Sequence, residues 1–93
     1  MKIGFLVNAV ETEKAGFTTI RLAHEAINKG HEAFIFGVGD LAYDDDDCIH
    51  ARAVTASKKS YGSHELYFKD IQGPKAVRRR ITVDDLDVLM LRN

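Results

Sequence analysis

An arginine and an asparagine stand just past the ends of two apolar segments that both have the character of strands. Asn8 follows the apolar run of residues 2–7, and Arg92 and Asn93 follow the apolar run of residues 88–91. An arginine guanidinium suits a carboxylate or a phosphate because it can donate two parallel hydrogen bonds. If the two strands are parallel, their carboxyl ends share one sheet edge, where ligands bind in open α/β sheets. The spacing is compatible with an anion pocket and equally with two solvated strand ends.

Two threonines begin the segment that follows the first polar loop. Thr18 and Thr19 start residues 18–30, where apolar residues recur at helical spacing and Gly30 suits a left-handed C-terminal position. Backbone N–H groups at a helix N-terminus attract anions, so the two hydroxyls would stand beside such a site. The alternative is that one threonine simply caps the helix. No G-x-G-x-x-G or Walker A glycine run follows the first strand, which disfavours a dinucleotide or P-loop site there.

Two other motifs resemble ligand sites but have simpler explanations. Residues 37–40 contain G-x-G after the second strand rather than the first, so we interpret them as a tight bend. Residues 44–47 are four adjacent aspartates. Calcium loops instead space their ligands at alternate positions around a glycine, so a solvated turn is expected.

Histidine, cysteine and serine form no recognisable catalytic or metal motif. The histidines show no i, i+4 pair and no cysteine partners at zinc spacing, and the cysteine and serines lack a nucleophile motif. The residues concerned are His24, His31, His50, His64, Cys48, Ser57, Ser60 and Ser63. We therefore expect neither a metal site nor a nucleophilic catalyst.

The one dense basic patch is residues 75–80, which include Arg78, Arg79 and Arg80. It suits phosphate or the acidic face of a partner. The alternative is a solvated strand or loop that balances the acidic turn, and the pattern fits both.

An α/β scaffold is needed to position these residues. Residues 2–7 are continuously apolar after the first, which is typical of a strand covered on both faces, and a second strand begins at residue 32 or 33. With the helix between them they form a βαβ unit. Residues 86–92 predict another buried strand. The expected fold class is α/β, a Rossmann-like open and mostly parallel sheet with an added β-hairpin.

The hairpin is assigned to the middle of the chain. Alternation of apolar residues from Ile49 to Ala53 predicts an exposed strand, which also carries His50, and residues 64–71 predict another. The short polar connection between them favours a hairpin. Residues 72–85 are poorly determined, although Thr82 can cap a helical turn over residues 83–86.

Length and composition set the outer limits. The chain has 93 residues, which suits one domain over residues 1–93, and its net charge of −1 disfavours nucleic-acid or anionic-membrane partners. No apolar run approaches the roughly 18 residues of a membrane span. A single cysteine is compatible with a reducing compartment, so a cytoplasmic protein is expected.

Three segments together resemble the N-terminal domain of bacterial glutathione synthetase. They are MKIGFLVN with its loop to the two threonines, EAINKGHEAFIFGVGDLAY, and ITVDDLDVLMLRN. The middle segment is the most specific, because it joins a helix ending in Lys-Gly-His-Glu, a strand, and a Gly-Asp-Leu bend that leads to a tyrosine. HARAV resembles the hairpin strand that follows, and residues 57–80 match least.

The resemblance implies a pre-ATP-grasp domain of a ligase that joins γ-glutamylcysteine to glycine with ATP and magnesium, through an acyl phosphate. It places ATP and magnesium in C-terminal ATP-grasp domains, so this chain is expected to bind no cofactor or metal and to have no catalysis of its own. Matched position by position, the residues on the substrate side are Asn8, Thr18, Thr19 and Arg92. The family's chain continues past its final arginine through Asp-Pro-Pro, so we expect this chain to be the front of a longer protein.

One departure and two alternatives qualify that expectation. The family has Asp-Pro where this chain has Asn8 and Ala9, which removes a negative charge and leaves the small-molecule peptide or amino-acid substrate open. A two-Rossmann nucleotide-sugar glycosyltransferase opens with a similar strand and helix, but carries a Gly-Gly pair in its first loop. A stand-alone homodimeric binding module is the other alternative, with the strand at residues 48–56 as its association surface.

Overall fold

The computed structural model describes residues 1–10, 18–43, 45, 47–73 and 76–91. These residues form two helices and six strands, and the strands make up a single sheet. In chain order the elements are β1 (Lys2–Val7), α1 (Thr18–Asn28), β2 (Glu32–Gly37), β3 (Leu41–Tyr43), β4 (Ile49–Thr55), α2 (His64–Gln72), β5 (Val77–Thr82) and β6 (Val88–Leu91). Short 3₁₀ turns at Val38–Asp40 and Val83–Asp85 lead into β3 and towards β6.

The sheet is mixed rather than mostly parallel. β1 lies between β2 and β6 and pairs with both in parallel. β4 is antiparallel to its three neighbours β2, β3 and β5. On one side β2 and β3 pair with different parts of its length, and β5 pairs along the other side. The expectation of an open α/β sheet is confirmed, and its parallel, Rossmann-like character is confined to β2, β1 and β6.

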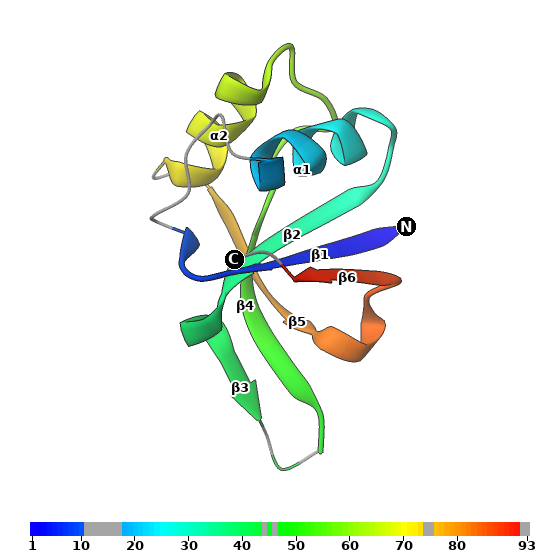
Figure 1. Ribbon diagram of the computed structural model, residues 1–93, viewed down its shortest axis with the longest axis vertical. Helices are drawn as coiled ribbons and strands as arrows, with labels where there is room; N and C mark the ends of the chain where they lie inside the picture. The colour runs from blue at the N-terminus through cyan, green and yellow to red at the C-terminus, as the bar shows by residue number, and fades with distance from the viewer. Residues whose placement is uncertain (11–17, 44, 46, 74–75, 92–93) are drawn as a thin grey trace.

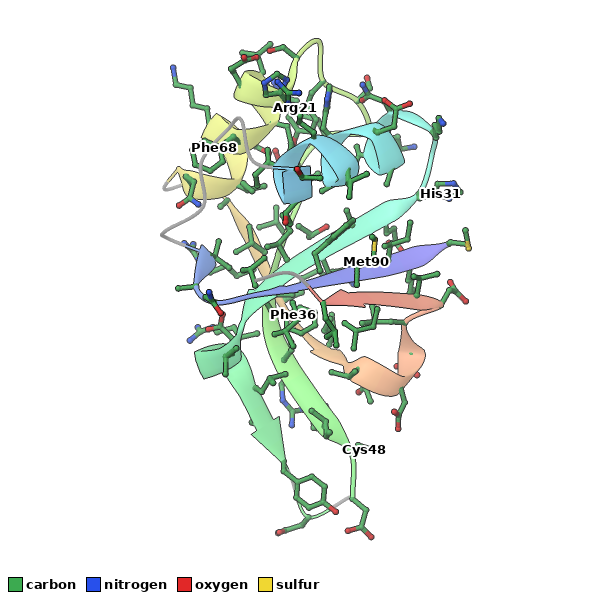
Figure 2. All side chains as sticks on the ribbon, viewed as in Figure 1. Arg21, His31, Phe36, Cys48, Phe68 and Met90 are labelled. Carbon is green, nitrogen blue, oxygen red and sulfur yellow. The ribbon has the colours of Figure 1, made fainter. Side chains whose placement is uncertain are left out.

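Both helices pack on the same face of the sheet, above β1 and β2 in Figure 1. Apolar residues of α1 recur at helical spacing and are buried there against alternate residues of the strands. This core contains Phe5, Val7, Ile20, Ala23, Ile27, Ala33, Ile35, Val54, Tyr67 and Ile71. A smaller cluster on the opposite face gathers Phe34, Phe36, Ala51 and Ala53, with Phe36 at the centre of Figure 2.

The predicted strand over residues 64–71 is wrong, since these residues form helix α2. Ser63 caps it, because its hydroxyl accepts a hydrogen bond from the backbone N–H of Leu66 at 3.3 Å. Tyr67 and Ile71 are buried at i, i+4 spacing on the face that meets the core. The hairpin predicted from this segment is therefore also wrong. A hairpin does occur, but it joins β3 to β4 and projects away from the helices in Figure 1.

Two burial predictions are reversed by the order of the strands. β4 was expected to be exposed, but it has neighbours on both sides, and His50 and Ala53 are 6% and 0% exposed. β6 was expected to be buried, but it is the last strand of the sheet, and Leu89 and Leu91 are 41% and 71% exposed. An apolar run in the sequence predicts a strand, but it does not indicate how many other strands will flank that strand in the sheet.

The ends of α1 and the turn before β6 agree with the sequence in part. Gly30 has a φ of 90°, as a left-handed C-terminal residue requires. α1 begins at Thr18, so neither threonine precedes the helix as a capping residue. The helical turn after Thr82 is present, but the Thr82 side chain does not cap it and lies 3.1 Å from His50 Nδ1 instead.

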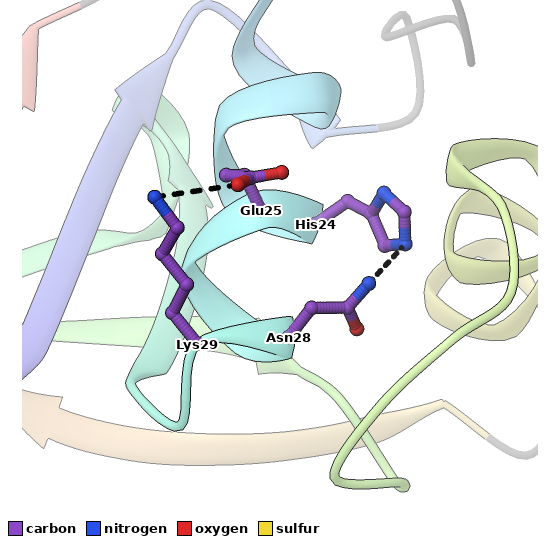
Figure 3. A network of polar contacts seen from close by, with 4 residues as sticks. All are labelled: His24, Glu25, Asn28 and Lys29. Carbon is purple, nitrogen blue, oxygen red and sulfur yellow. Dashed lines mark hydrogen bonds and ion pairs between the residues drawn. The ribbon is translucent and has the colours of Figure 1, made fainter.

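A polar network fixes α1 to the connection before α2. The Asn28 side chain donates from Nδ2 to the Tyr61 carbonyl oxygen at 3.0 Å and accepts from the Tyr61 backbone N–H at 2.9 Å. His24 Nε2 lies 3.0 Å from both the Asn28 amide nitrogen and the Tyr61 carbonyl oxygen. In Figure 3 these two side chains turn towards that connection, while the ion pair of Glu25 and Lys29, at 3.4 Å, lies apart from them at the C-terminal end of α1.

Asp70 holds the other end of that connection. Its Oδ2 accepts hydrogen bonds from the Tyr61 hydroxyl and from the Ser57 hydroxyl, the latter at 2.8 Å. Burial alone would raise the pKa of Asp70, but the hydrogen bonds from Tyr61 and Ser57 outweigh it and lower the pKa. The ionised carboxylate is therefore favoured by the folded state.

This shift predicts how Asp70→Asn changes stability with pH. A carboxyl whose pKa is depressed on folding contributes stability above its unfolded pKa of about 4, and loses it as pH falls through the folded pKa. The loss of unfolding free energy caused by Asp70→Asn should therefore be largest at neutral pH and shrink below about pH 4. Urea titrations of both proteins between neutral and acid pH measure it, and a difference independent of pH would contradict the assignment.

Two tyrosines next to each other are expected to respond oppositely to phenylalanine. Tyr67 is 0% exposed, and its hydroxyl has no hydrogen-bond partner among the residues that the structure describes. An unsatisfied buried hydroxyl costs about 1–3 kcal/mol, so Tyr67→Phe should raise the unfolding free energy by about 1 kcal/mol. Tyr61→Phe is the matched control and should lower it by a similar amount, because it removes the donor to Asp70. Equal signs in urea denaturation would refute the prediction.

Candidate functional site

The carboxyl ends of β1, β2 and β6 lie together at one edge of the sheet. Register pairs Leu6 of β1 with Phe36 of β2 and with Leu91 of β6, so the three parallel strands end level with one another. Asn8 follows β1 and is exposed at this edge. Arg92, the other residue predicted for the pocket, lies outside the described residues. β1 and β6 are parallel neighbours, which meets the condition under which Asn8 and Arg92 were expected to follow strands that end at one edge.

Gly37 holds the chain after β1 close to the end of β2. A Cβ placed on Gly37 would lie 3.1 Å from the Ala9 Cα and 3.2 Å from the Asn8 carbonyl oxygen. Both neighbours are backbone atoms, so a side chain there would have to displace the chain itself. The φ of Gly37 is −89°, which any residue adopts, so glycine is required for space and not for conformation.

The bend after β2 is braced by Asp40. Its Oδ2 accepts a hydrogen bond from the Gly37 backbone N–H at 2.8 Å and closes the turn of Val38–Asp40. The interpretation of residues 37–40 as a tight bend is confirmed. The close contact of this bend with the backbone of Asn8 and Ala9 was not predicted from the sequence. Gly37 could have indicated it, because glycine often marks a place where another backbone approaches closely.

Helix α2 anchors the same loop from the other side. The Gln72 side chain donates from Nε2 to the Val10 carbonyl oxygen at 2.7 Å. Val10 is itself buried. Residues 8–10 are therefore held at one end by the contact with Gly37 and at the other by Gln72. A backbone fixed in this way presents Asn8 in one position, which a binding site needs.

The two threonines divide into one exposed and one buried residue. Thr18 is exposed at the first turn of α1, whereas Thr19 is 4% exposed and packs inward. Residues 11–17, which join Asn8 to Thr18, lie outside the described residues. Thr18 is therefore accessible to solvent at the start of α1, whereas Thr19 belongs to its buried face.

The described residues do not fit a resident magnesium site. Among them, no three His, Cys, Asp or Glu side chains gather closely enough to hold a metal ion. The part of the chain that the structure describes also has no helix long and apolar enough to cross a membrane. The edge at Asn8 offers an amide and backbone groups, which suit binding by hydrogen bonds.

Comparison with known proteins supplies the family. No curated protein matches the sequence closely enough to count as a relative. The family described as the N-terminal domain of prokaryotic glutathione synthetase matches residues 1–93, the whole of the chain. The Gly-Asp bend at residues 37–40 belongs to the segment of the sequence that carries the resemblance most specifically. The chain belongs to the prokaryotic glutathione synthetase N-terminal domain family.

Proposed function

We propose that this domain forms the substrate-side wall of an ATP-dependent carboxylate–amine ligase. The observation that carries the proposal is the family match over residues 1–93, together with strand ends that meet at one edge of the sheet. ATP and magnesium would bind to C-terminal ATP-grasp domains of a longer, cytoplasmic protein. The reaction class is the joining of an acidic peptide or amino-acid substrate to an amine through an acyl phosphate, as in glutathione synthesis.

Three polar residues are proposed to meet the substrate. Arg92 would pair with a substrate carboxylate, because its guanidinium donates two hydrogen bonds in a fixed geometry. Asn8 and Thr18 are both exposed and would supply an amide and a hydroxyl beside it. Thr19, which is buried, would support the start of α1 beneath them. Asn8 carries no charge, so the substrate is expected to place an uncharged polar group there.

The exposed side of β6 supports a domain that docks on further protein. Val88, Leu89 and Leu91 are 40%, 41% and 71% exposed on an edge strand. Open strand edges and apolar surface of this kind are ordinarily covered by another element. We propose the ATP-grasp part of the same chain as the cover. Association of two copies would be the competing explanation, and gel filtration of the longer protein distinguishes them.

The test is a ligation assay on the longer protein. Purified protein is incubated with ATP, magnesium, glycine and γ-glutamylcysteine, and product and ADP are measured together by mass spectrometry and a coupled assay. ATP-dependent glutathione formation supports the proposal in full. Ligation of a different acidic dipeptide or amino acid supports the reaction class and replaces the substrate.

The domain by itself provides the control. It should neither hydrolyse ATP nor bind it, because the residues proposed to hold ATP lie in other domains. Saturable ATP binding by residues 1–93 at micromolar affinity would overturn the assignment of this domain to the substrate side. Absence of any ATP-dependent product from the longer protein with a panel of acidic substrates would overturn the ligase itself.

A further inference from the structure

A glutamine at the end of α2 holds the first loop of the chain across the fold. Gln72 is the last residue of that helix, and its Nε2 donates a hydrogen bond at 2.7 Å to the carbonyl oxygen of Val10, 62 positions earlier in the chain. The distance is at the short end of the usual range for an N–H donor. Gln72 is half-buried, so the bond is partly shielded from water. It therefore fixes a backbone atom only two residues from Asn8.

The backbone around Asn8 decides where this exposed side chain points. Val7 and Val10 are 2% and 9% exposed and belong to the core beneath the helices. A Cβ on Gly37 would lie 3.2 Å from the Asn8 carbonyl oxygen, so the bend after β2 confines the same backbone from another side. The direction of the Asn8 side chain therefore depends on how residues 8–10 are held.

Helix α2 gives Gln72 a rigid base. Tyr67 and Ile71 are 0% and 1% exposed and pack into the core. Asp70, in the same turn as Gln72, accepts hydrogen bonds from the Ser57 backbone N–H at 3.2 Å and from the Ser57 hydroxyl at 2.8 Å. A side chain carried by a packed helix holds its partner more precisely than one carried by a loop. Gln72 is therefore suited to fixing residues 8–10 in one place.

We propose that Gln72 is a positioning residue for the acidic substrate, because it holds the Val10 carbonyl group and so keeps Asn8 directed towards the site at the ends of β1 and β6. The inference rests on the proposed function, since it needs a substrate at Asn8. The Gln72 amide acts through the backbone of residues 8–10 and does not contact the substrate. Coupling of this kind is reciprocal, so bound substrate should in turn stabilise the last turn of α2.

Gln72→Leu in the longer protein tests this role, because leucine is similar in size and donates no hydrogen bond. The KM for the acidic substrate should rise about two- to tenfold, the range set by one neutral hydrogen bond, and the KM for ATP should stay the same. Gln72→Asn keeps the amide but shortens its reach by one methylene group, so it should have the same effect. The matched control is Lys69→Leu, at an exposed position one turn earlier on α2, which should change neither KM.

A double substitution separates positioning from a general loss of stability. Gly37→Ala displaces residues 8 and 9 from the other side, so it acts on the same segment as Gln72→Leu. The effects of the two changes on the KM for the acidic substrate should therefore be less than additive as free energies. Independent damage to two separate parts of the fold would instead be additive, and that result would contradict the positioning role.

NMR relaxation of residues 1–93 tests the same role without a measurement of activity. The order parameters of the Asn8 and Val10 amides should fall in Gln72→Leu from the roughly 0.85 of rigid backbone, and should not change in Lys69→Leu. Unchanged order parameters in Gln72→Leu overturn the positioning role. Normal ligation by Gln72→Leu with an unchanged KM for the acidic substrate also overturns it and leaves the proposed function standing. A longer protein that ligates no acidic substrate overturns both, and only that outcome removes the proposed function.

Discussion

Gly37→Ala is expected to lower the free energy of unfolding by about 1–3 kcal/mol, the usual cost of forcing extra volume into a packed site. The new Cβ would stand 3.1 Å from the Ala9 Cα and 3.2 Å from the Asn8 carbonyl oxygen, and backbone atoms yield less readily than the end of a side chain. Gly37→Val should cost more, because its branched side chain needs still more room. Urea denaturation of the isolated domain measures both variants.

Gly39→Ala is the matched control for that experiment. Gly39 lies two residues along in the same bend, and a Cβ there would meet no atom within 4 Å. The same substitution should therefore be neutral or stabilise the protein slightly, through the lower entropy of the unfolded chain. Equal losses at the two positions would mean that the bend needs glycine for its conformation, and that the contact with residues 8 and 9 is unimportant.

The Gly37 variant should also report on the proposed site. Since Asn8 and Ala9 must move to admit the Cβ, the longer protein carrying Gly37→Ala should show a raised KM for its acidic substrate. Its KM for ATP should stay the same, because ATP is proposed to bind elsewhere. A change in ATP affinity alone would place this bend outside the substrate site.

Arg92→Ala in the longer protein is expected to raise the KM for the acidic substrate about tenfold to a hundredfold. A hydrogen bond to a charged group contributes about 1.5–3 kcal/mol, and each 1.4 kcal/mol is a factor of ten. The loss should appear mainly in KM for that substrate, with little change for ATP, if Arg92 holds a group that does not react. Steady-state kinetics with each substrate varied in turn measures this.

Arg21→Ala serves as the control for Arg92→Ala, because it removes the same charge from an exposed position on α1. It should leave both KM values unchanged. Equal effects of Arg92→Ala on the acidic substrate and on ATP would remove Arg92 from the substrate side. Rescue of part of the loss by Arg92→Lys would indicate that charge, more than the two-pronged geometry, carries the interaction.

Local pattern was sufficient for the front of the fold. Residues 2–7, 18–30 and 32–37 carry a continuous apolar run, a helical apolar stripe ending in glycine, and a second apolar run. Each pattern is set by residues within a few positions of one another, so the βαβ unit follows from the sequence. The family resemblance used these segments together with residues 81–93, and parallel pairing was the condition under which Asn8 and Arg92 were expected to follow strands ending at one edge.

Three features needed the assembled structure. Helix α2 was missed because its residues have ambiguous local preferences, and the capping by Ser63 and the burial of Tyr67 and Ile71 decide the outcome. The burial of β4 and the exposure of β6 depend on how many strands flank each one. The contact of Gly37 with residues 8 and 9 joins the ends of two different strands.

The sequence by itself therefore determined the βαβ unit, the family, and the types of residue at the candidate site. Only the tertiary structure decided that β6 is an exposed edge strand and that Gly37 packs against the backbone of Asn8. It also decided that Arg52 of β4 pairs with Arg80 of β5. The physical reason is that periodicity reports which face of an element is apolar, whereas strand order and register are set by contacts between residues far apart in the chain.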